Sequence, residues 1–132
     1  MHLTGKCLCG SVKFEAQSDG EGADRCHCKM CRRWGGVYDS VFVASETVQI
    51  EAGEDLIKWY ESSDFARRGF CSNCGSNLFY HADRHKDFSH LYAVSVGTLD
   101  EPTNLRVKKH YFCASKGDYY EIEDRLEKLD TY

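Results

Sequence analysis

Hydrophobic and polar residues alternate over several short stretches, which glycine and polar turns separate. The clearest example is residues 11–16, where Val12, Phe14 and Ala16 would lie on one face of an extended chain. Short runs of this kind are typical of β-strands that have one buried face. The segments that we expect to form strands are residues 11–16, 37–44, 47–50, 55–62, 77–82, 90–97 and 105–114.

Two stretches have helical features instead. Residues 27–36 are expected to contain a short helical turn. At the C-terminus, residues 119–132 place Ile122, Leu126 and Leu129 at positions i, i+4 and i+7, which predicts a capping helix. The fold class predicted from these patterns is therefore mainly β, with little helix and with bound metal adding to a modest core.

Length and composition indicate one soluble globular domain that covers residues 1–132, since 42% of the residues are hydrophobic and 29% are charged. Seventeen basic and 21 acidic residues give a net charge of −4, so nucleic acid is not an expected partner. No apolar run is long enough to span a membrane, and the first ten residues do not resemble a signal peptide. We therefore expect a cytoplasmic protein without a membrane partner.

Seven of the eight cysteines fall into three closely spaced groups: Cys7 and Cys9; Cys26, Cys28 and Cys31; Cys71 and Cys74. Thiols this close in sequence cannot link distant segments of chain to one another. In a reducing compartment, C-x-C and C-x-x-C spacings instead favour a metal chelate, with zinc as the expected ion.

The first and third groups could together form a closed four-thiolate site. On an extended strand, Cys7 and Cys9 would point to the same side and offer two sulfurs to one ion. Cys71 and Cys74, followed by a glycine, have the spacing of a zinc knuckle. A tetrahedral site filled by protein ligands leaves no room for substrate, so its expected role is structural. Spacing alone leaves other pairings of the groups open.

The remaining group, Cys26, Cys28 and Cys31, offers three ligands and one open position, which is the pattern of a catalytic zinc. Three thiolates leave a net charge of −1, which suits holding an incoming thiol as a thiolate better than producing hydroxide. The alternative is a fourth protein ligand that closes the site. His27 would face away on a strand, and Cys113 is more typical of a buried strand cysteine. The full set of candidates is His27, His81, His110 and Cys113.

Several longer segments follow one another in a familiar order: "GKCLCGSVKFEA", "CHCKMCRRWGG", "SSDFARRGFCSNCGSNLFY", "VSVGTLDEP" and "HYFCASKGDYY". With these segments the sequence resembles the glutathione-dependent formaldehyde-activating family, which also includes centromere-protein-V-like proteins. The resemblance extends over most of the chain. It implies a β-tent fold, in which small antiparallel sheets meet around a structural zinc.

The resemblance also implies two zinc ions per chain and a division of the ligands between them. The structural zinc would take Cys7, Cys9, Cys71 and Cys74, and the catalytic zinc would take Cys26, Cys28 and Cys31. The implied activity is that of a carbon–sulfur lyase with a small-molecule thiol as partner. Glutathione, with its sulfur at or near the second zinc, would combine with formaldehyde to give S-hydroxymethylglutathione.

Three further residues are candidates for supporting roles. Arg67 and Arg68 could pair with substrate carboxylates, because a guanidinium binds a carboxylate through two parallel hydrogen bonds, or they could be scaffold charges flanking a strand. His110 could assist proton transfer or be an ordinary structural histidine.

Two other functions compete with the lyase. A non-catalytic zinc module could bind protein or nucleic acid through its pairs of adjacent basic residues together with Trp34 and Trp59. A thiol redox enzyme resembling methionine sulfoxide reductase B would use Cys113 as its nucleophile and would require a lowered pKa for that thiol. Exposed strand edges are compatible with a monomer or a homodimer.

Overall fold

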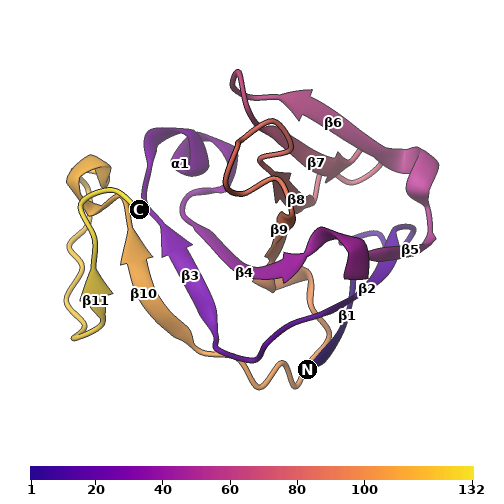
Figure 1. The fold of residues 1–132 in the computed structure, drawn as a ribbon, viewed down its shortest axis with the longest axis horizontal. Helices are drawn as coiled ribbons and strands as arrows, with labels where there is room; N and C mark the ends of the chain where they lie inside the picture. Colours follow the sequence, from indigo (N-terminus) through magenta and orange to yellow (C-terminus); the bar gives the residue numbers. More distant parts are fainter.

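The computed structural model describes all residues from 1 to 132 as two β-sheets and one short α-helix (Figure 1). The smaller sheet has three antiparallel strands in the order β1–β2–β5. Its strands are β1 (His2–Lys6), β2 (Lys13–Gln17) and β5 (Gln49–Ala52).

The larger sheet has eight strands in the order β11–β10–β3–β4–β9–β8–β7–β6. All its neighbours are antiparallel except that β10 runs parallel to both β3 and β11. The mainly β prediction is confirmed, although this sheet is larger than the small antiparallel sheets expected. In chain order its strands are β3 (Ala23–Cys26), β4 (Tyr38–Ala44), β6 (Ile57–Glu61), β7 (Arg67–Cys71), β8 (Asn77–His81), β9 (Leu91–Ser95), β10 (Val107–Tyr111) and β11 (Glu127–Lys128).

Helical structure is confined to short segments. The α-helix α1 covers Lys29–Gly35, inside the range predicted for a helical turn. The other helical segments are four 3-10 turns. No helix of the structure is long and apolar enough to cross a membrane. The turns are η1 (Ser45–Thr47), η2 (Glu54–Leu56), η3 (Val96–Thr98) and η4 (Cys113–Ser115).

The main core forms where the smaller sheet packs on the larger one. Along β2, Phe14 and Ala16 are buried while the strand ends are exposed, as the alternation predicted. Phe14 meets Phe79 of β8 edge-to-face, with ring centroids 5.0 Å apart. Other buried members of this core include Leu3, Val12, Val41, Val43, Leu78 and Val94.

Every segment predicted to be extended contains an observed strand, but four observed strands were not predicted: β11, which lies where a helix was expected, and β1, β3 and β7. Strand β1 has one large buried side chain, Leu3. Strand β3 has only four residues, and one of its buried side chains is the polar Asp24. Strand β7 begins with Arg67 and Arg68 and contains a glycine. Their apolar content is too low to give a clear period of two, so these strands depend on pairing with their neighbours in the sheet.

The predicted C-terminal helix is wrong, because residues 119–132 form an irregular strap that turns back on itself beside β10 and contains only the two-residue strand β11 (Figure 1). The strap makes its backbone hydrogen bonds with another segment instead of within itself. The Leu129 N–H donates to His110 O at 2.9 Å, and the Cys113 N–H donates to Leu129 O at 2.9 Å. These long-range bonds override the weak helical periodicity of the sequence.

Candidate metal centres

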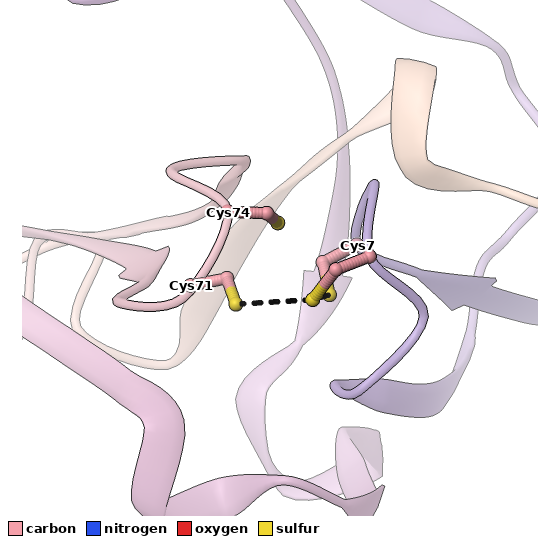
Figure 2. Close-up of side chains that lie close together, drawn as sticks. Cys7, Cys71 and Cys74 are labelled. Carbon is pink, nitrogen blue, oxygen red and sulfur yellow. Dashed lines mark hydrogen bonds between the residues drawn. The ribbon is translucent and has the colours of Figure 1, made fainter.

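The four-cysteine cluster consists of Cys7, Cys9, Cys71 and Cys74, whose sulfur atoms all lie within 4.8 Å of one another. Figure 2 shows the side chains of Cys71, the last residue of β7, and Cys74, in the β7–β8 connection, directed toward Cys7 in the segment after β1. The strand geometry expected for Cys7 and Cys9 is wrong, because β1 ends at Lys6. A turn after β1 brings the two sulfurs to 3.5 Å instead.

Hydrogen-bond donors surround the sulfurs of the four-cysteine cluster. The Asn73 side-chain amide donates to Cys9 Sγ at 3.2 Å, and the Ser76 hydroxyl lies 3.2 Å from Cys74 Sγ. The bond from Ser76 lowers the pKa of Cys74 to about 5, because it favours the thiolate over the thiol. These donors therefore prepare the cluster for metal binding.

The turn that carries Cys74 requires a glycine after it. Gly75 has φ +80°, a conformation that other residues adopt only with strain. Its N–H donates to Cys71 O at 2.7 Å and closes the turn. Four converging thiols, two of them buried, are a donor set that fits zinc, and an ion held there would join the smaller sheet to the β7–β8 hairpin.

The three-cysteine cluster consists of Cys26, Cys28 and Cys31, whose sulfurs again lie within 4.8 Å of one another. Cys26 ends β3, Cys28 is the N-cap of α1, and Cys31 lies in the helix. Cys28 Sγ accepts a hydrogen bond from the Cys31 N–H at 3.3 Å. This capping bond sets the spacing of two of the three sulfurs. Three thiols fit zinc as a partial coordination shell.

No fourth histidine, cysteine or carboxylate ligand atom joins the three-cysteine cluster. The ring of His81 instead bonds Ser89 O at 2.8 Å. Cys113 is a half-buried residue in η4 and not the buried strand cysteine expected from the sequence. The structure thus brings together the three predicted ligands and none of the four candidates for closing the site.

The neighbouring thiols of Cys26 and Cys28 shift each other's pKa in opposite directions. The pKa of Cys28 is lowered and the pKa of Cys26 is raised, in each case mainly by the other side chain. The lowered pKa favours the thiolate form of Cys28, whose sulfur also accepts a backbone N–H.

Arg68 reaches the three-cysteine cluster from β7, although it is distant in sequence. Its side chain is buried, and its Nη1 and Nη2 atoms lie 3.7 and 3.8 Å from Cys31 Sγ. The guanidinium also lies 4.9 Å from the ring centroid of Trp34 and 5.0 Å from that of Tyr80. Because Arg68 is buried, it is not at the surface, where it could pair with a carboxylate of a substrate.

Arg67 faces the other side of β7. Its guanidinium lies 4.1 Å from the ring centroid of Trp59 and pairs with Asp83 at 3.4 Å. Adjacent strand residues point to opposite faces, so Arg67 and Arg68 must have different surroundings. The sequence does not show which of the two faces Cys31, because that depends on the tertiary fold.

A chain of hydrogen bonds lies behind the cysteines. His27 Nε2 lies 2.8 Å from His110 Nδ1, and His110 Nε2 lies 2.9 Å from Asp124 Oδ2. The other ring nitrogen of His27, Nδ1, lies 2.7 Å from the Tyr120 hydroxyl. When both imidazoles are neutral and Asp124 is ionised, the Tyr120 hydroxyl donates to His27, His27 donates to His110, and His110 donates to the carboxylate. The bonds connect the C-terminal strap to residues 26–28.

His27 is therefore a residue that fixes the cysteine segment from the side opposite the sulfurs, in agreement with its expected orientation. Both His27 and His110 are buried and line an open pocket of about 360 Å³ beneath the strap. A structural role for His110 is supported by its full set of partners. The sequence did not indicate the hydrogen bonds of Tyr120 and Asp124 to these histidines, because it predicted a helix at both positions.

Replacing Tyr120 by phenylalanine removes one hydroxyl and leaves His27 Nδ1 without its partner. We expect Tyr120→Phe to lower the free energy of unfolding by about 1–3 kcal/mol, the usual cost of an unpaired buried polar group. Tyr119→Phe is the matched control, because Tyr119 is exposed and its change should stay within about 0.5 kcal/mol. Denaturant titration of both variants measures this, and equal losses would contradict the assigned bond.

Comparison with known proteins shows which proteins the chain resembles. The chain is 34% identical over 121 residues to an "Uncharacterized lyase" of Schizosaccharomyces pombe, which covers 92% of this chain and 85% of that protein. It is 28% identical over 134 residues to a "Putative glutathione-dependent formaldehyde-activating enzyme" of Halomonas elongata, covering 95% and 83% of the two chains. A crystal structure of a Rhodobacter sphaeroides protein aligns with 76% of this chain and 89% of its own, with a TM-score of 0.64 and 25% identity.

A family model described as glutathione-dependent formaldehyde-activating enzyme matches residues 2–115. That range contains all seven clustered cysteines and Arg68, while the strap lies entirely beyond it. Because the match covers most of the chain, the chain belongs to the glutathione-dependent formaldehyde-activating enzyme family.

Proposed function

We propose that the chain is a carbon–sulfur lyase that joins a small thiol to an aldehyde and reverses the reaction. Glutathione and formaldehyde are the proposed substrates, and S-hydroxymethylglutathione is the proposed adduct. The observation that carries this proposal is the three-cysteine cluster, which gathers three sulfurs without a fourth ligand in a member of this family.

Each cluster has a separate role in the proposal. Cys7, Cys9, Cys71 and Cys74 would hold a structural zinc, and Cys26, Cys28 and Cys31 would hold the catalytic one. A zinc ion bound by three thiolates supplies a positive centre that stabilises a substrate thiol in its deprotonated form. The fold contributes the fixed positions of the three sulfurs and of the side chains around them.

The proposed reaction is a reversible addition in which atoms and charge balance. The thiolate sulfur forms a bond to the aldehyde carbon, the carbonyl π bond opens, and the oxygen takes up the proton that the thiol lost. Bringing both reactants together in one orientation accounts for rate acceleration without an added oxidant or reductant.

The two competing functions find less support in the geometry. Arg67 is paired with Asp83 and Arg68 is buried, so these basic residues are not free to bind a polyanion. For the redox alternative, burial and the nearby Asp130 raise the pKa of Cys113, whereas a nucleophilic thiol needs a lowered pKa.

The zinc-loaded protein is expected to accelerate exchange between glutathione, formaldehyde and their adduct above the spontaneous rate. Exchange spectroscopy with ¹³C-formaldehyde at equilibrium measures this rate directly, with buffer as the reference. Cys113→Ser should exchange as fast as the unaltered protein, which would show that Cys113 is not a nucleophile in this reaction. A protein with two bound zinc ions and no acceleration over buffer would contradict the proposal.

A further inference from the structure

The buried charge of Arg68 has one partner, the three-cysteine cluster. A guanidinium removed from water is destabilising unless an anion or a strong acceptor compensates it. Arg68 has no carboxylate within 4.0 Å, and the acceptor that its side-chain nitrogens reach is Cys31 Sγ. The fold therefore places a fixed positive charge against one sulfur of the three-cysteine cluster.

The aromatic rings around Arg68 hold this charge in place. Trp34 follows Cys31 by one turn of α1 and Tyr80 lies opposite Arg68 in the β7–β8 pairing. The guanidinium lies within 5.0 Å of both ring centroids, a range in which rings attract cations. A planar fork fits between two rings and still directs two nitrogens at one sulfur, which an ammonium group cannot do in the same way.

We propose that Arg68 is a positioning residue of the three-cysteine metal centre, and this rests on the proposed function. Three thiolates and a divalent ion together carry −1, and Arg68 brings the local sum to zero. This neutralisation keeps Cys31 available as a ligand. It also allows a further thiolate, from a substrate, to approach without repulsion by excess negative charge.

The four-cysteine cluster offers an internal comparison within the same chain. Neutral groups approach its sulfurs, namely the Asn73 amide and the Ser76 hydroxyl, and no arginine or lysine donates to them. Removal of the Arg68 charge should therefore affect one metal centre and leave the other unchanged.

The test measures zinc affinity at both centres by competition with a chelator, so it does not depend on activity. Arg68→Met is expected to weaken one of the two ions about 10–100-fold, the range found when groups supporting metal ligands are removed. Arg68→Lys, which retains the charge, should recover part of this affinity. Arg67→Met is the matched control and should leave both ions unchanged, because Arg67 faces Trp59.

Cys28→Ser identifies which ion belongs to the three-cysteine cluster. Unchanged affinities in Arg68→Met, or an equal loss in Arg67→Met, would overturn the role of Arg68 alone. An unaltered protein that binds only one ion would instead overturn the proposed function and this inference with it. If Arg68→Met does not fold, the comparison of Arg68→Gln with Arg68→Lys decides, and equal affinities in these two would overturn the proposal.

Discussion

Replacement of Cys71 by serine is expected to unfold the domain. Cys71 is fully buried in the main core, and its sulfur is one of the four that converge between the two sheets. Metal binding at an all-thiolate site of this kind contributes to folding a free energy on the order of 10 kcal/mol. Since small domains are stable by about 5–15 kcal/mol, loss of this centre removes most of the margin.

Circular dichroism and thermal denaturation would measure the effect of Cys71→Ser. Cys113→Ser is the control, because Cys113 belongs to neither cluster and is only half-buried. A zinc chelator added in excess to the unaltered protein should reproduce the unfolding. A Cys71→Ser variant with native spectra and an unshifted midpoint would show that the four-cysteine cluster does not stabilise the fold.

Replacement of Cys28 by serine is expected to have the opposite pattern, with loss of one zinc ion and of lyase activity while the fold survives. Cys28 caps the seven-residue helix α1 and lies outside the main core. The strands that flank it, β3 and β4, keep their ladder of hydrogen bonds in the larger sheet. Two remaining sulfurs are too few to hold the ion at the affinity of three.

Metal analysis by mass spectrometry, together with the exchange assay, would measure the Cys28→Ser variant. We expect one zinc per chain, a native circular dichroism spectrum and exchange at the spontaneous rate. A variant that unfolds as Cys71→Ser does, or that keeps both ions and full activity, would show that the division into structural and catalytic centres is wrong.

The candidate metal ligands could be predicted from the sequence because chelating cysteines are local signals. A pair such as Cys71 and Cys74 comes from one turn, and its spacing is visible without any knowledge of the fold. The strand pattern was similarly local wherever large apolar residues alternated, as around Phe14. The pairing of the clusters was not local, and the family resemblance supplied it.

The features that sequence reasoning missed depend on contacts between distant segments. Arg68 lies 37 residues from Cys31 in sequence, and nothing near it indicates a sulfur partner. The hydrophobic periodicity of the tail predicts a helix that would include Tyr120 and Asp124. It contains no information on the backbone hydrogen bonds with β10 that hold the tail in another conformation. Long-range pairing of this kind overrides local preference.

The turn after β1 and the β7–β8 hairpin meet although Cys9 and Cys71 are separated by 62 positions in the sequence. Capture of one ion by both segments in a disordered chain would close that loop and reduce the conformational entropy that folding must overcome. The segment with Cys26, Cys28 and Cys31 lies inside this loop. In the order of the sequence, the three-cysteine cluster thus lies within the span of chain that an ion at the four-cysteine cluster would close, so closure of that span would also confine the proposed catalytic centre.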